Sequence, residues 1–339
     1  MCNTAAYVGT QTAAPILLEM IQKQEGIGGG HYTGLATIHE GKLHYRKVVG
    51  DSAHLRATTD AEELPGTIGI CHSRTPSGGD VEWGQPFVNC EQTLAYLAQG
   101  SMGYWEGRTD TDAMAAALAA KGHTFRAVAD EKIGKYPVLP DGRCVHMSEL
   151  MCHAISDALD ETGDPEEAIR QAFTDWPAEI MGFYLTQRHP DTVYGARYNQ
   201  PVCIGRGSDG TYMASTPRAF PNHVAWQMWL PPSSVVAATV DGVRISSLGP
   251  ADDAIVDDID ACAVRELVLA RLQEGPILAS NLFGPVKALS ARTDRVVACD
   301  AFYQVLPDLE REGIIGHETV RVDGSAPGLS APKVKLFLK

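Results

Sequence analysis

The chain begins with Met1-Cys2-Asn3-Thr4-Ala5-Ala6-Tyr7-Val8-Gly9, and we expect this stretch to decide the fold. Cysteine is small enough for Met1 to be trimmed, which would leave Cys2 with a free α-amine beside its thiol. An α-amine titrates near neutral pH, so it can serve as a general base for the attacking thiolate. The apolar run at 5–8, ended by Gly9, predicts a buried first strand. The alternative reading is a chance cysteine before such a strand.

Length and composition indicate a large globular protein. The chain has 339 residues, 44% of them hydrophobic and 21% charged, which is enough for a large core and two domains. It has no apolar run of membrane-spanning length and no signal-peptide pattern. Eight cysteines in such a chain indicate reduced thiols in a cytoplasm. A formal net charge of −14 argues against nucleic acid as a partner, because a phosphate-binding face is basic.

Hydrophobic periodicity predicts strands and helices that alternate along the chain. Strands are expected at 5–8, 32–39, 42–49, 67–72, 92–98, 182–187, 193–197, 202–205 and 212–215, and helices at 13–24, 110–121, 149–160 and 165–173. We expect the last four strands to form one antiparallel meander. This order predicts sheets with helices layered outside them. The glycine cluster at 26–30 lacks a following Gly-Lys-Ser/Thr, so a flexible connection is favoured over a phosphate loop.

Two groups of polar residues suggest ligand binding. Arg74 ends a buried strand and precedes a Gly/Pro/Ser loop, where its planar guanidinium suits a carboxylate; a structural ion pair is the alternative. Candidate metal ligands are Cys144, His146, Cys152 and His153. Adjacent residues on a helix point to different faces, and the spacing fits no standard zinc site. We therefore expect no metal and no other cofactor.

The chain resembles the glutaminase domain of class II glutamine amidotransferases, most closely that of glucosamine-6-phosphate synthase. Cys2 to Gly9 is similar to the family's opening Cys-Gly-Ile-Val-Gly-x-Ile-Gly, and Gly69-Ile70-Cys71-His72-Ser73-Arg74 to Gly-Ile-x-His-Thr-Arg. Tyr32-Thr33-Gly34-Leu35-Ala36, Lys121-Gly122-His123-Thr124-Phe125 and the last strands match further motifs in order, over roughly residues 2 to 240. The resemblance implies an α+β fold: a four-layer αββα N-terminal-nucleophile hydrolase sandwich.

The resemblance also implies a mechanism. The Cys2 thiol would attack the side-chain amide of glutamine, its α-amine would move the protons, and ammonia would leave. Arg74, with its neighbours Ser73 and Thr75, would bind the substrate, the arginine holding the α-carboxylate. The ammonia would go to a separate acceptor enzyme, because the chain is too short for the synthase's isomerase domains.

Several positions depart from the family pattern. The oxyanion hole, Asn-Gly in the family, aligns with Gln99-Gly100, where the longer side chain shifts the donor. The tryptophan after the motif arginine is Thr75 here. The aspartate that holds the substrate α-amine aligns with Asp130 counting forward from Phe125, and with Met147 counting backward from Glu167. We favour Asp130; with Met147 there, free glutamine would be a poor substrate.

The C-terminal part reads as a separate unit, and we expect domains at 2–245 and 246–339. An acidic linker at 252–258 precedes helices at 259–273 and 277–289. Residues 299–315 read like the third helix of a winged helix, with wing strands at 320–323 and 334–338. Acidic residues on that helix would repel DNA, so packing against protein or a homo-oligomer is expected. The leading function is an amidohydrolase; the alternatives are a non-catalytic amide-binding sensor or subunit, and a ligand-responsive regulator.

Overall fold

Two antiparallel sheets form the centre of the fold in the computed structural model, which describes residues 2–76, 78–100, 107–177, 179–249, 255–256, 258–292, 296–297 and 299–339. The seven-stranded sheet has the order β13-β11-β12-β1-β4-β2-β3, and the six-stranded sheet has the order β15-β14-β10-β9-β6-β5. The strands of the first are β1 (Asn3–Gly9), β2 (Tyr32–His39), β3 (Lys42–Val49), β4 (Ile68–Arg74), β11 (Cys203–Arg206), β12 (Gly210–Ala214) and β13 (Trp226–Trp229). Those of the second are β5 (Phe87–Val88), β6 (Leu94–Gln99), β9 (Met181–Thr186), β10 (Val193–Arg197), β14 (Ser234–Thr239) and β15 (Gly242–Ser247).

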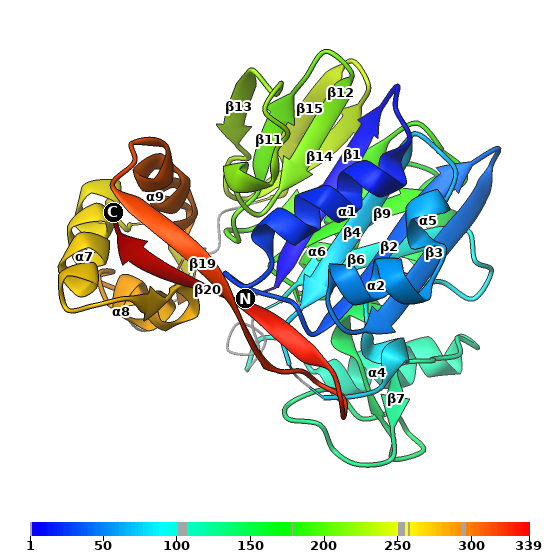
Figure 1. The fold of residues 1–339 in the computed structure, drawn as a ribbon. Coiled ribbons are helices and arrows are strands. Elements are labelled where there is room, and N and C mark those ends of the chain that lie inside the picture. Colours follow the sequence, from blue (N-terminus) through cyan, green and yellow to red (C-terminus); the bar gives the residue numbers. More distant parts are fainter. Residues whose placement is uncertain are drawn as a thin grey trace.

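Helices cover the outer face of each sheet (Figure 1). Side chains alternate across a strand, so Ala6 and Ile70 of the first sheet meet Phe183 of the second in a shared core. The other face of the first sheet packs against α1 (Ala13–Gln24) and α2 (Ser52–Thr58). The second sheet packs against α5 (Met147–Thr162) and α6 (Pro165–Asp175), with α4 (Thr111–Ala120) beside α5. The layers are therefore helix, sheet, sheet and helix.

Strand β1 lies inside the first sheet, where β4 and β12 flank it. Thr4 is opposite His72 on β4, and Ala5 is opposite Ala214 on β12. Because residues 2, 4, 6 and 8 share one face of the chain, the alternation directs Cys2 into the space between the sheets. The fold thus presents Cys2 at the start of a strand that is held on both sides.

The C-terminal part forms a smaller unit with its own core (Figure 1). Its elements are α7 (Ala261–Gln273), β17 (Ile277–Leu278), α8 (Phe283–Lys287), α9 (Asp300–Arg311), β19 (Ile315–Asp323) and β20 (Ser330–Leu338), and its sheet has the order β17-β20-β19. The β19–β20 hairpin contacts the larger part: the backbone N–H of Val334 donates to Gly26 O at 3.0 Å, and Arg321 pairs with Asp51 at 2.6 Å. Two short pairs, β7 (Val128–Ala129) with β8 (Cys144–Val145) and β16 (Ile255–Val256) with β18 (Val296–Val297), complete the strands described.

Several predicted elements have the observed bounds: the helix at 13–24 and the strands at 32–39, 42–49 and 193–197. The single meander is wrong. Strands β9 and β10 belong to the second sheet, whereas β11 and β12 belong to the first, so the chain crosses between the sheets at 198–202. Alternation along each strand is the same in either arrangement, which is why the pattern could not distinguish them. Among the described residues no helix is long and apolar enough to cross a bilayer.

The glycine cluster is close-packed and not a flexible connection. Gly29 has a φ of +65°, and a Cβ there would lie 2.6 Å from the carbonyl oxygen of Ser73. Gly26 has a φ of +92°, and its Cβ would meet Val334 N at 2.8 Å. Only glycine fits both the left-handed backbone and the space. The predicted helix at 277–289 is instead β17, a short 3-10 turn and α8. Of the predicted acidic linker, 252–254 and 257 lie outside the described residues.

Candidate active site

The thiol of Cys2 lies beside two side chains from the region of β4. Its Sγ is 3.7 Å from Thr75 Oγ1. The buried His72 imidazole is close enough to act on the thiol, and neither ring nitrogen has a hydrogen-bond partner in the part of the chain that is described. Burial by itself would raise the pKa of the Cys2 thiol, but His72, the positive charge of the N-terminus and Thr75 together outweigh it and lower the pKa to about 6. At neutral pH Cys2 is therefore mostly a nucleophilic thiolate.

Arg74 is buried on the same face of β4 as His72. Its Nη1 donates to the carbonyl oxygens of Gly78 and Trp83, both at 3.1 Å, and its guanidinium carbon lies 4.8 Å from the Tyr32 ring centroid. Nη2 is buried without a hydrogen-bond partner among the described residues. A buried arginine that is fixed at one nitrogen and free at the other can bind a carboxylate in a defined orientation.

Three side chains near Cys2 are absent from the predictions made from sequence. Burial raises the pKa of the Tyr136 hydroxyl, with Arg74 acting in the opposite direction and Cys2 adding to the rise. Burial raises the pKa of Glu179 to about 8, against a hydrogen bond from Ser148, and the charge of Cys2 contributes to the rise. Burial also raises the pKa of Tyr303, with Cys299 and Cys2 contributing. All three are close enough to Cys2 to sense its charge.

These three residues come from separate parts of the chain. Tyr136 lies between β7 and β8, Glu179 precedes β9, and Tyr303 is on α9 of the C-terminal unit. The Oε2 of Glu179 and the hydroxyl of Tyr303 are buried and have no hydrogen-bond partner within the described ranges. For Glu179 the sequence offers a weak signal, a glutamate directly before an apolar strand. For Tyr136 and Tyr303 the sequence offers no signal.

Gln99 is the last residue of β6, and Gly100 follows it. The Gln99 side chain is buried, and its Nε2 donates to Ser215 Oγ at 2.8 Å. Ser215 Oγ also accepts from the backbone N–H of Thr4 at 3.0 Å. Gln99 is thus tied to β1 two residues beyond Cys2, with one of its two amide hydrogens committed.

Two other predicted substrate contacts lie elsewhere. The Ser73 hydroxyl is on the opposite face of β4, where it donates to Glu25 Oε1 at 2.8 Å and accepts from Gly30 N at 2.8 Å. Asp130 is exposed in the turn after β7. Met147, which we weighed as its alternative, is the first residue of α5 and is fully buried in the core under that helix. Because successive side chains of a strand point to opposite faces of the sheet, the sequence alone implied that Ser73 and Arg74 of β4 do not share a site.

The four candidate metal ligands do not gather. The Cys144 thiol contacts the carbonyl oxygens of Ile133 and Tyr136 at 3.9 Å, and His146 packs on the ring of Phe87. Cys152 faces the carbonyl oxygen of Phe87 at 3.6 Å. His153 instead lies close to Cys90 and His123. No arrangement of metal ligands around Cys2 is found among the described residues.

Comparisons with known proteins give relatives in sequence and structures of similar fold. No protein-family model matches the chain. Glutamine–fructose-6-phosphate aminotransferase (isomerizing) from Pyrococcus horikoshii is 27% identical over 223 residues, which are 65% of this chain and 33% of that protein. The protein of the same name from Methanothermobacter thermautotrophicus is 27% identical over 256 residues, 73% of this chain and 38% of its own. The chain thus matches about a third of the length of these relatives.

Solved structures show the same fold. The glutamine phosphoribosylpyrophosphate amidotransferase of B. subtilis superposes with a TM-score of 0.56 and 17% identity, over 73% of this chain and 49% of that one. A structure of the allosteric regulatory enzyme of purine biosynthesis gives a TM-score of 0.56 and 16% identity. At this identity the likeness concerns the fold alone. Together, the sequence matches and the shared fold support the resemblance of this chain to the glutaminase domain of class II glutamine amidotransferases.

Proposed function

We propose that this chain is an amidohydrolase that releases ammonia from glutamine or a related carboxamide, with Cys2 as the nucleophile. The observation that carries the proposal is the Cys2 thiol near the otherwise unpartnered His72, which has the largest part in lowering its pKa to about 6. The thiolate attacks the amide carbon, the C–N bond breaks as a proton reaches the leaving nitrogen, and a thioester forms. Water then cleaves the thioester to the acid and restores the thiol.

The other residues supply binding and charge stabilisation in this proposal. After loss of Met1, the α-amine of Cys2 carries the proton to the leaving ammonia, because its pKa is near neutrality. Nη2 of Arg74 binds the substrate α-carboxylate. Gln99 offers its second amide hydrogen, and Gly100 its backbone N–H, to the oxyanion of the tetrahedral intermediate.

We propose that Glu179, and not Asp130, meets a positively charged group of the substrate. Asp130 is exposed, and Met147 brings no charge to the start of α5. Glu179 is fully buried, senses the charge of Cys2 and has one oxygen without a partner. An ammonium bound at that oxygen would offset the burial that raises the pKa of Glu179, and would ionise the carboxyl. This arrangement favours substrates that carry an amine near the carboxamide.

We expected the C-terminal unit to begin at 246, but β15 of the larger part ends at Ser247, so we propose that this unit begins after β15 and is winged-helix-like. Supporting features are its order of helix, short strand, two helices and hairpin, and its sheet order β17-β20-β19. Its third helix, α9, packs against the larger part, with Glu310 pairing with Arg218 at 3.0 Å and Thr216 Oγ1 donating to Tyr303 O at 3.1 Å. This packing favours a role in covering the active site and argues against a role in binding DNA. The ammonia would be used by an acceptor domain or enzyme.

The test is an ammonia-release screen over glutamine, asparagine and amides that lack the α-amine, with Cys2→Ala as the control. We expect release that requires Cys2 and falls when the substrate amine is removed. Mass spectrometry of the active protein should show Met1 absent and Cys2 alkylated by a glutamine-like electrophile. Retained Met1 in active protein would exclude the α-amine base, and release that survives Cys2→Ala would exclude the nucleophile.

A binding-only role is the second candidate, and Gln99 favours it, because one amide hydrogen of this expected oxyanion donor is committed to Ser215. It predicts that an amide ligand binds equally well to the wild type and to Cys2→Ala, as measured by calorimetry, without ammonia release. Ammonia release that depends on Cys2 would rule it out.

A further inference from the structure

A cluster of one cysteine and two histidines lies on the helical side of the six-stranded sheet, away from Cys2. Cys90 is in the turn before β6, His123 follows α4, and His153 is on α5. Their candidate ligand atoms all lie within 4.8 Å of one another. We propose that Cys90, His123 and His153 bind a Zn²⁺ ion or a similar borderline-soft divalent metal.

The distances fit a tetrahedral metal centre. Cys90 Sγ lies 3.9 Å from His123 Nδ1 and 4.0 Å from His153 Nδ1. Zinc–sulfur and zinc–nitrogen bond lengths at a tetrahedral angle require an S···N separation of about 3.6 Å. The two S···N separations therefore need to contract by less than about half an ångström to bind the ion, and the three ligand atoms lie within 4.8 Å of one another. Thiolate and imidazole select Zn²⁺ or a related transition metal over Mg²⁺ and Ca²⁺, which prefer oxygen ligands.

Neighbouring groups prepare the ligands for a metal. The backbone N–H of Thr124 donates to Cys90 Sγ at 3.4 Å, which holds the sulfur in place beside the two rings. Asp157 Oδ1 lies 2.8 Å from His123 Nε2, so this carboxylate holds the proton on Nε2 and leaves the Nδ1 lone pair toward Cys90. A carboxylate behind a ligating histidine is the usual outer shell of a zinc site.

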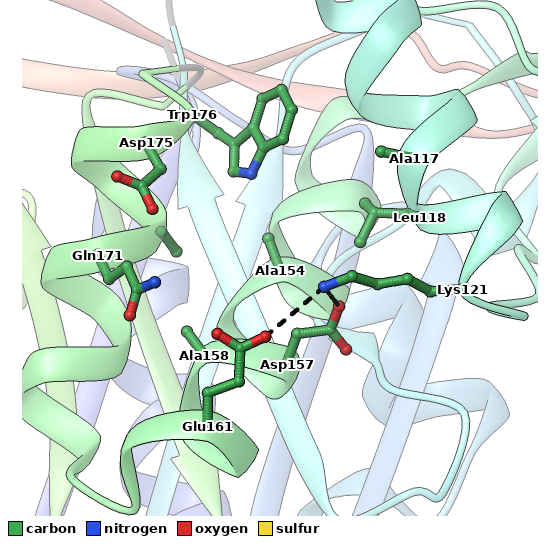
Figure 2. A pocket seen from close by; sticks show the side chains of 11 residues that line it. Ala117, Leu118, Lys121, Ala154, Asp157, Ala158, Glu161, Gln171, Asp175 and Trp176 are labelled. Carbon is green, nitrogen blue, oxygen red and sulfur yellow. Dashed lines mark hydrogen bonds and ion pairs between the residues drawn. The ribbon is translucent and has the colours of Figure 1, made fainter.

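Asp157 is itself held in place on its other side. Its Oδ2 accepts from Lys121 Nζ at 2.8 Å, and Figure 2 shows this pair at the edge of a surface pocket between α4 and α5. The Asp157 carboxylate thus contacts Lys121 at the pocket with one oxygen and His123 with the other. Cys90 and His123 are partly exposed, so an ion has a route to the cluster and a water can complete the coordination as the fourth ligand.

The proposed ion would fasten the segment at 121–127 to α5. Directly after His123, the backbone N–H groups of Arg126 and Ala127 donate to the Glu149 carboxylate at 2.9 and 2.8 Å. Glu149 lies in the first turn of α5, next to Ser148, which holds Glu179. The metal would therefore stabilise the layer that supports one side of the active site without entering the reaction.

The experiment is a Co²⁺ titration of the full-length chain, followed by displacement with Zn²⁺ against a chromophoric chelator. We expect one equivalent of Co²⁺, with the thiolate-to-cobalt charge-transfer band and the strong visible bands of a tetrahedral site. Binding releases the Cys90 proton, so buffer acidification should accompany it. A wild-type protein that shows no charge-transfer band would overturn the proposal.

Variants assign the ion to this cluster. Cys90→Ser and His123→Gln alter partly exposed residues, and each should abolish the band, whereas Asp157→Asn should weaken binding about 10- to 100-fold. Cys262→Ser, at an exposed thiol of α7, and Cys2→Ala should bind as the wild type does. A band that persists in Cys90→Ser, or that disappears in Cys2→Ala or Cys262→Ser, would place the metal elsewhere and refute the site.

Discussion

Among the groups that lower the pKa of the Cys2 thiol, the His72 imidazole has the largest effect. We predict that alkylation of Cys2 by iodoacetamide follows a pKa near 6 in the wild type, because His72 and these other groups lower the pKa of the thiol to about 6. In His72→Gln burial is opposed only by the N-terminal charge and Thr75, so the pKa should rise to about 8.5 or above, which lowers the thiolate fraction at pH 7 by about 30-fold or more. The measurement is the pH dependence of alkylation of the N-terminal peptide by mass spectrometry.

The exposed thiol of Cys262 provides the internal reference for this experiment. Its alkylation profile should be the same in both proteins, which separates an effect on Cys2 from a general change in the fold. A wild-type midpoint above pH 8, or an unchanged midpoint in His72→Gln, would show that the histidine does not activate the thiol.

The buried carboxyl of Glu179 should make stability depend on pH. Burial raises the pKa of Glu179 from 4.5 in the unfolded chain to about 8, so its contribution is fully present below pH 4.5 and is lost as the pH rises through 8. We predict that the free energy of unfolding of the wild type falls across this window, and that Glu179→Gln removes a few kcal/mol of the fall. Urea titrations at pH 5, 7 and 9 measure it.

A part of the fall should remain in Glu179→Gln, because burial raises the pKa of Glu149 to about 7 in the same direction. Glu149→Gln is therefore the matched comparison. If the wild type becomes more stable between pH 5 and pH 8, neither carboxyl is held in its neutral form.

At the scale of elements, one carboxylate ties four of them together. Glu25 follows α1 and accepts from the backbone N–H and hydroxyl of Ser52 at the start of α2, from Thr33 of β2 and from Ser73 of β4, at 2.7 to 3.2 Å. Glu25→Ala leaves the buried Ser52 N–H without an acceptor and should lower the free energy of unfolding by about 3 kcal/mol. Chemical denaturation followed by circular dichroism tests this.

Glu25→Gln is the control for this prediction, because it keeps the volume and one oxygen acceptor. It should cost less than Glu25→Ala, since Ser52 N–H keeps a partner. Equal stability of Glu25→Ala and the wild type would mean that the four elements are held together by apolar packing alone.

At the scale of the molecule, a buried ion pair joins the C-terminal unit to the larger part. Arg197 of β10 is fully buried and pairs with Asp300 of α9. Asp300→Ala would leave the arginine as an uncompensated buried charge, so we predict a loss of about 3–5 kcal/mol in the free energy of unfolding. Urea unfolding followed by tryptophan fluorescence measures the loss.

The matched control is Glu312→Ala on the same unit, which removes the exposed partner of Arg265. Exposed pairs contribute little, so its unfolding curve should stay close to that of the wild type. If Asp300→Ala and Glu312→Ala behaved alike, the interface between the two parts would not depend on the buried pair.

The sequence by itself determined the local elements and part of the site. Hydrophobic periodicity predicted the bounds of α1, β2, β3 and β10, because the apolar face of each element is formed by residues close together in the sequence. Cys2 and Arg74 could be predicted as site residues because each lies in a short motif, Cys2 directly before a buried strand and Arg74 at the end of one.

Only the tertiary structure decided the rest, because it depends on contacts between residues far apart in the chain. The crossing from β10 to β11, the placement of Tyr136, Glu179 and Tyr303 near Cys2, and the meeting of Cys90 with His123 and His153 leave no periodic signal. Desolvation and orphaned polar groups, which mark these sites, arise only when distant elements pack together.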